Sequence, residues 1–144
     1  MSALICTANS SSVGTGSATT KTILQITAPA STGIRVTRAS ISFDGTSPTA
    51  GKALVELVKG ATSGTGTNLT PLKVHGHTGS VQSTAKENFS GEPSGGSVAF
   101  SELVHTQSGY TAPEEIVLNP GETLAFRTNV PAAVNARARF RWEE

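Results

Sequence analysis

The chain has 144 residues, of which only 15% are charged and 5% aromatic, and its 11 basic and 10 acidic residues give a formal net charge of +1. This length fits one domain of ordinary size, and the balanced charge excludes the long-range field that draws proteins to nucleic acid or anionic membranes. A single cysteine excludes an intrachain disulfide and a metal–thiolate cluster, and no apolar run approaches the roughly 20 residues that span a bilayer.

The N-terminal segment, residues 1–20, is predicted to be an arm. The short apolar stretch at 3–8 (ALICTA) could be an edge strand or an arm that leaves the body. It precedes a run rich in Gly, Ser and Thr, a composition typical of flexible connections. Leu4 and Ile5 would form the apolar tip of this arm, suited to strand addition onto a neighbouring chain. The first residues lack the pattern of a signal peptide, so we expect a protein that is made and kept in a cytoplasm or that leaves as part of an assembly. Residues 21–144 are predicted to form a single β-sandwich domain.

Three strands are predicted next along the chain. The run 22–28 (TILQITA) is followed by 34–44 (IRVTRASISFD), in which the apolar residues change phase near Thr37 and Arg38. A change of phase within one strand indicates a β-bulge. Residues 53–59 (ALVELVK) are interpreted as a strand, since the run is short and lies between glycines.

The middle of the chain is predicted to be mostly loop. Residues 60–70 and 76–96 are polar and rich in Gly, Ser and Thr. The second of these is long for a loop in a compact domain, which is typical of functional or mobile segments. A brief strand at 71–75 separates the two loops, and another strand is expected at 97–106.

The last part of the chain carries the clearest strand. Its apolar residues alternate strictly with polar ones: Val134, Ala136, Ala138, Phe140 and Trp142. That period of two predicts a strand with one buried and one solvated face. Before it, runs at 115–118 and 123–128 flank residues 119–122 (NPGE), whose Pro and Gly specify a type II turn between neighbouring antiparallel strands.

The fold class predicted from these elements is all-β. About eight or nine strands without a convincing helix favour an antiparallel two-sheet β-sandwich or jelly roll, with the flexible N-terminal arm attached.

No constellation of residues predicts catalysis. Serines are frequent, but none lies in a Gly-x-Ser-x-Gly elbow, and Asp44 is the sole aspartate. His75 and His77 would share one face of an extended segment, yet a metal site needs a third ligand and none is placed nearby. Cys6 is expected to be a small apolar filler. We therefore predict a protein that is not an enzyme, with no catalytic, cofactor-binding or metal-binding residues.

Arginines gather in the last eighteen positions of the chain. Arg137, Arg139 and Arg141 take the polar phase of the final strand, about 7 Å apart, and Arg127 lies on the preceding strand. Arginine is enriched at interfaces and binds carboxylates through paired hydrogen bonds. The alternative is an open sheet face that charge keeps soluble. We predict an interface formed by these four arginines and, from the arm, Leu4 and Ile5.

Two stretches carry a family resemblance. Residues 24–60 (LQITAPASTGIRVTRASISFDGTSPTAGKALVELVKG) and 117–144 (VLNPGETLAFRTNVPAAVNARARFRWEE) resemble small structural proteins found among tailed-bacteriophage virion genes. The family is that of the capsid decoration proteins, also called cement or head-stabilising proteins, whose jelly-roll bodies sit as trimers on the head surface. Residues 62–96 have no pattern that we can assign to this family.

The resemblance implies a virion structural protein that binds the outer surface of a phage capsid as a trimer and stabilises it. Its partners would be the major capsid protein and further copies of itself, with no cofactor, nucleic acid or membrane. It would be made in the host cytoplasm and reside on the capsid surface. An alternative is a tail-fibre or baseplate receptor-binding module, although one Trp, one Tyr and one Asp offer little for stacking on or bonding to sugars.

Overall fold

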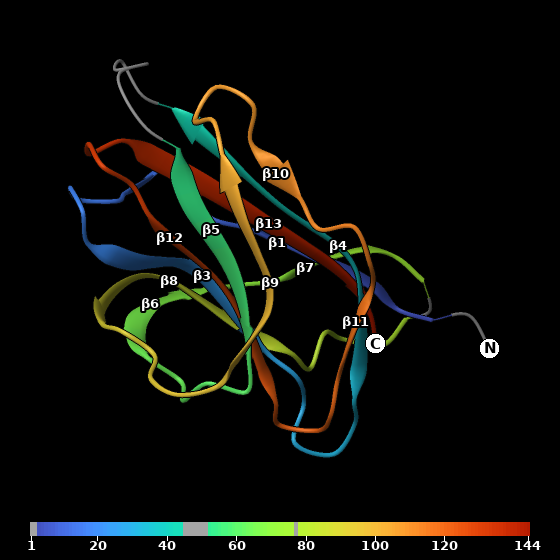
Figure 1. Ribbon diagram of the computed structural model, residues 1–144. Helices are drawn as coiled ribbons and strands as arrows, with labels where there is room; N and C mark the ends of the chain where they lie inside the picture. Colours follow the sequence, from blue (N-terminus) through green and yellow to red (C-terminus); the bar gives the residue numbers. More distant parts are fainter. Residues whose placement is uncertain (1–2, 45–51, 77) are drawn as a thin grey trace.

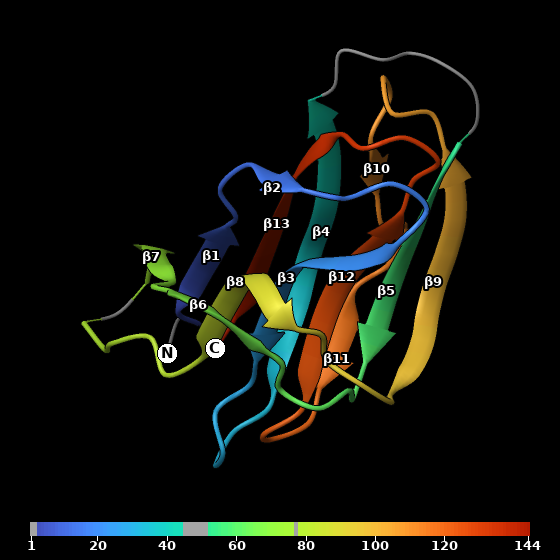
Figure 2. The same ribbon diagram turned by 90° about the vertical axis from the view of Figure 1, so that its left-hand side faces the viewer.

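Two antiparallel sheets pack face to face in the structure, a computed structural model that describes residues 3–44, 52–76 and 78–144 (Figures 1 and 2). The prediction of an all-β, two-sheet β-sandwich is confirmed. The described residues contain no helix of the length and apolar character that crossing a bilayer takes.

Figure 2 shows both sheets with their strands in order. The seven-stranded sheet contains β10 (Tyr110–Thr111), β4 (Ile34–Asp44), β13 (Asn135–Glu143), β1 (Ile5–Asn9) and β7 (Leu72–His75), with β11 (Ile116–Leu118) also paired to β4 and β2 (Val13–Gly14) to β13. The six-stranded sheet contains β6 (Thr65–Leu69), β8 (Thr84–Gly91), β3 (Thr20–Thr27), β12 (Thr123–Asn129), β5 (Ala53–Lys59) and β9 (Ser97–Val104).

The described residues form thirteen strands, more than the eight or nine expected. Part of the excess comes from interrupted strands, since β10 and β11 pair successive parts of β4 while β1 and β2 pair successive parts of β13. Ser10 bridges the second interruption, because its N–H donates to Ala138 O and its Oγ accepts from Ala138 N, both at 2.9 Å. The remaining two additional strands, β6 and β8, lie where the sequence predicts loops. Both strands are largely polar and lack a clear apolar period, which is why their sequences do not indicate strands.

Residues 5–9, expected in a flexible arm, form β1 inside the seven-stranded sheet. β1 pairs with β13 on one side and with β7 on the other. Leu4, Cys6 and Ala8 are at most 2% exposed and belong to the main core, and Cys6 lies opposite Trp142. The side chains of these three alternate residues point to the inner face of the sheet and fill it. A truncation that reaches residue 8 or beyond would therefore remove side chains of the main core.

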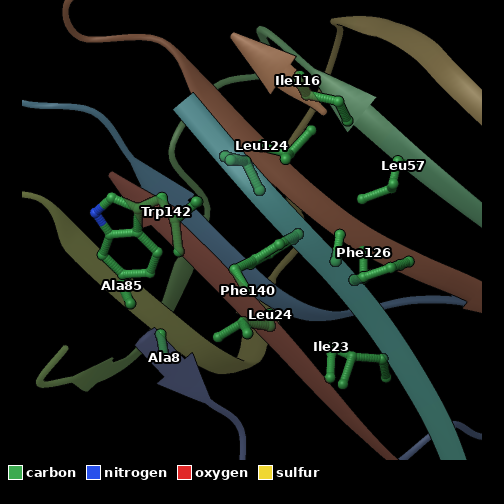
Figure 3. Packing of buried hydrophobic residues seen from close by; sticks show 14 of the residues in the cluster. Ala8, Ile23, Leu24, Leu57, Ala85, Ile116, Leu124, Phe126, Phe140 and Trp142 are labelled. Atoms are coloured by element: carbon green, nitrogen blue, oxygen red, sulfur yellow. The ribbon is translucent and has the colours of Figure 1, made fainter. Parts of the chain in front are cut away.

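The core lies between the two sheets, as Figure 3 shows from close by. The predicted alternation of the last strand is confirmed, because every apolar residue from Val134 to Trp142 in that pattern is buried. Phe140 of β13 stacks on Phe126 of β12 with ring centroids 5.3 Å apart, so one aromatic pair joins the two sheets. Trp142 is fully buried, and its Nε1 donates to Glu144 Oε2 at 3.1 Å.

The predicted type II turn is confirmed at residues 119–122. Gly121 has φ +75°, and Glu122 N donates to Asn119 O at 3.0 Å. The strands on either side of it are not neighbours in one sheet, however. β11 pairs with β4, whereas β12 pairs with β3 and β5. The turn therefore carries the chain from one sheet to the other. The residues of a turn determine its backbone conformation but not the strands with which its two flanking strands pair.

The predicted bulge in β4 is also confirmed, and it shapes the outer surface. Val36 lies opposite Trp142 and Arg38 opposite Arg141, so Thr37 is the extra residue. Without a bulge, positions 35 and 38 would lie on opposite faces, because side chains alternate along a strand. The extra residue brings both Arg35 and Arg38 onto the outer face of the seven-stranded sheet.

Candidate functional site

The outer face of the seven-stranded sheet is the strongest candidate for a binding surface. β13 runs through the middle of this sheet, and its inward side chains are alanines and large aromatics. Arg137 and Arg139 are exposed and Arg141 is partly exposed on the opposite face. The three arginines predicted to form a row therefore do so, on a face that the rest of the described chain leaves at least partly exposed.

Small polar side chains flank this row on the neighbouring strands. On β4, Ser42 lies opposite Arg137 and Ser40 lies opposite Arg139. On the other side of β13, Asn9 of β1 lies opposite Arg139. Because these neighbours are much shorter than arginine, they leave free volume beside the guanidinium groups.

This free volume is a groove of about 460 Å³ over β10, β4, β13 and the end of β1. It is lined by Asn9, Ser10, Arg38, Ser40, Ile41, Ser42, Ser108, Gly109, Tyr110, Thr111, Arg137, Ala138 and Arg139. Figure 1 shows β10 beside β4 on the side away from β13. Three arginines thus share one groove with several hydroxyl groups and an amide.

Close approach of the chain at Gly109 forms one wall of the groove. Gly109 has φ +70°, and a Cβ built on it would lie 2.8 Å from Ile41 O. A side chain at this position would therefore be both strained and in collision with β4. The glycine lets β10 pair with β4, where Tyr110 lies opposite Ile41 and Thr111 opposite Ser40.

The charges of the groove are uncompensated within the described part of the chain. Its lining contains no Asp or Glu, and Arg38, Arg137 and Arg139 take part in none of the ion pairs formed by the described residues. Arg141, just outside the groove, has its Nη2 3.5 Å from Nε2 of His75 on β7.

Among the described residues, acidic side chains lie at both ends of the arginine row. At one end, Arg35 Nη2 lies 2.5 Å from Glu143 Oε2, and Arg35 Nε lies 3.7 Å from Glu115 Oε2. The hydrogen bond to Glu143 and the charge of that carboxylate raise the pKa of Arg35. At the other end, the exposed Asp44 lies opposite Asn135. The positive patch is therefore bounded along the strand direction.

The structure separates Arg127 from the other predicted interface arginines. Arg127 lies on β12 in the six-stranded sheet, and its Nε donates to Glu56 Oε1 at 2.9 Å. The chain changes sheet between β12 and β13, so strands adjacent in the sequence do not share a face. Leu4 is 2% exposed and lies in the core, while Ile5 is partly exposed opposite Glu143.

Sequence reasoning missed several residues of the groove. Arg38 had a signal, because the phase change at the bulge implies that the residue after it turns outward. Ser40 and Ser42 had none, since their importance depends on the pairing of β4 with β13, two strands about a hundred positions apart. Nor did any local pattern place Thr111 beside them.

Other parts of the described structure offer less chemistry. Of the two histidines considered as metal ligands, His77 lies outside the described residues. The described residues contain no group of three or more His, Cys, Asp or Glu that could hold a metal ion. Cys6 is buried in the core, as expected of an apolar filler. A hollow of about 200 Å³ includes Glu144, but that carboxylate already accepts hydrogen bonds from Ser83 Oγ at 2.8 Å and from Trp142.

No family model, curated protein or solved structure matches this chain. The functional argument therefore depends on the outer face described above, together with the resemblance noted for residues 24–60 and 117–144.

Proposed function

We propose that this chain is a virion structural protein that binds the outer surface of a phage capsid as a homotrimer and stabilises it. The observation that carries the proposal is the row of arginines on an open sheet face, without acidic partners among the described residues. A protein that fastens shell subunits needs a rigid body and an adhesive surface rather than a reactive centre. The two-sheet core supplies the first, and the arginine face supplies the second.

Arginine suits this role because its planar guanidinium binds carboxylates through two parallel hydrogen bonds. A single patch of this size would bind weakly, since exposed charges are strongly solvated. A trimer presents three copies of the patch, and avidity then gives firm attachment without new contacts. The major capsid protein would be the partner, and the capsid surface the location.

The double variant Arg137→Ala with Arg139→Ala tests the proposal. We expect wild-type protein to elute as a trimer by size exclusion with light scattering, and to co-sediment with purified expanded phage heads. The double variant should fold normally, because both side chains are exposed, and should lose at least about tenfold in affinity for heads. Arg127→Ala is the matched control, since it removes one arginine from the other sheet and should leave head binding intact.

Two results would contradict the proposal. Unchanged head binding by the double variant would make the arginine row a merely solvated face. Wild-type protein that ignores heads but binds host cells would instead favour a tail-fibre or baseplate receptor-binding module.

A further inference from the structure

We propose that the groove along β4 binds an extended acidic segment of a partner polypeptide, with carboxylates at alternate positions. The inference rests on the proposed function, in that the capsid shell would supply this segment, and it specifies the chemistry that the shell must present.

The donors of the groove select an anionic partner. Arg38, Arg137 and Arg139 line it together with the hydroxyls of Ser40 and Ser42, and none of its described lining residues is a carboxylate. Guanidinium groups only donate hydrogen bonds, and hydroxyls can do so. A carboxylate offers two acceptor oxygens in the geometry that a guanidinium matches. Carboxylate side chains therefore satisfy both the charge and the hydrogen-bonding capacity of the groove.

The shape of the groove selects an extended conformation. Its lining spans β10, β4 and β13, neighbouring strands of one sheet, and includes Asn9 of β1 on the far side of β13. Arg137 and Arg139 occupy alternate positions of β13, so a partner aligned with the strand must repeat its charges at that spacing. Side chains on one face of an α-helix recur about every 5.4 Å, which does not match it. An extended segment does fit, and its alternate side chains repeat about every 7 Å, the same spacing that separates Arg137 from Arg139.

The acidic ends of the face limit the length of the partner segment. Outward positions from Arg137 to Arg141 span about 14 Å, and beyond them lie Asp44 at one end and Glu143 at the other. A nucleic acid carries phosphates at regular intervals well past this length and would meet those carboxylates. A short polypeptide with two or three acidic side chains avoids that repulsion.

The test uses the intact protein and synthetic peptides. The probe is a capped peptide of about seven residues in which glutamate alternates with threonine, and its control has glutamine in place of each glutamate. By isothermal titration calorimetry at low salt, we expect the glutamate peptide to bind and the glutamine peptide to show no binding. Arg139→Gln and Arg38→Gln should each weaken the peptide affinity at least about tenfold, whereas Arg127→Gln should not change it.

Competition experiments distinguish the other ligands. Inorganic phosphate or a short single-stranded oligonucleotide that displaces the glutamate peptide at equal concentration would overturn the inference in favour of a general anion site. Equal affinity for the glutamine peptide would overturn it too. The head-binding assay separates the two proposals. A protein that binds heads but not the glutamate peptide would refute this inference alone. A protein that binds the peptide but not heads would refute only the proposed function.

Discussion

The size of single side chains decides the shape of the outer face. Arg137 and Arg139 stand beside Ser42 and Ser40, and this pairing of long with short residues produces the groove. Larger residues at the two serine positions would fill that volume and cover the guanidinium groups. The inner face carries large side chains instead, because Phe140 and Trp142 are fully buried between the sheets and Phe140 stacks on Phe126.

Cys6 gives a prediction at the same scale. Burial, followed by the nearby charge of Glu144, raises the pKa of its thiol from 9.0 to about 12. The folded protein therefore favours the neutral thiol, so this contribution to stability is complete below about pH 9 and is lost as pH rises towards 12. We expect iodoacetamide to leave Cys6 unmodified at pH 8 in the folded protein and to modify it after denaturation, as followed by mass spectrometry.

The variant Cys6→Ala is the control for the alkaline range. It should show a smaller loss of unfolding free energy between pH 9 and pH 12 than the wild type. Rapid labelling of native Cys6 at pH 8, or identical alkaline profiles for the two proteins, would contradict the assignment of a buried neutral thiol.

At the scale of elements, β10 is a short strand with a specific task. It pairs with β4 at only two positions, although Ala112 N adds a hydrogen bond to Ala39 O at 2.9 Å. Tyr110 of this short element packs against the edge of the core, and the element also lines the groove. Its position depends on Gly109, which combines a positive φ with close contact to Ile41 O.

We therefore expect Gly109→Ala to detach β10 from β4 while the rest of the sandwich stays folded. Hydrogen exchange at the amide of Ala112 should become faster, and affinity for the glutamate peptide should fall. Gly121→Ala is the control, because Gly121 also has a positive φ but a Cβ there would meet nothing within 4 Å. It should cost about 1 kcal/mol of stability and leave peptide binding unchanged. Retained protection of Ala112 in Gly109→Ala would contradict this account of β10.

The sequence predicted correctly those elements whose conformation depends on a few neighbouring residues. The last strand, the bulge at Thr37 and the turn at Gly121 each have a signal within a few residues, and all three are confirmed. The polar strands β6 and β8 lack an apolar period, so their sequences predict loop. The separation of Arg127 from the arginine row, and the place of β1 inside a sheet, depend on pairing between distant segments, which no short stretch of sequence encodes.

At the scale of the whole molecule, surface charge and core packing are separable. The four ion pairs of the described residues all involve partly exposed side chains, while the core is apolar. Salt should therefore act on binding much more than on folding. This difference provides a test that needs no substitution.

Raising the salt concentration from about 0.1 M to 1 M shortens the Debye length from about 10 Å to about 3 Å. We expect affinity for phage heads to fall steeply over this range, because the proposed contacts join exposed arginines to carboxylates. The melting temperature should change little, since exposed ion pairs contribute little to stability. Head binding that strengthens with salt would point instead to apolar contacts, for which exposed Leu72 and Val74 on β7 are the nearest candidates.

The other strands of the described residues all precede β13, yet β13 lies between β4 and β1 and carries both Trp142 and the arginine row. A growing polypeptide on the ribosome cannot close this sheet until β13 has emerged, because the strands that flank it have no partner across that gap. An emerging chain that still lacks β13 therefore presents no arginine row, and under the proposed function it could not yet attach to a shell.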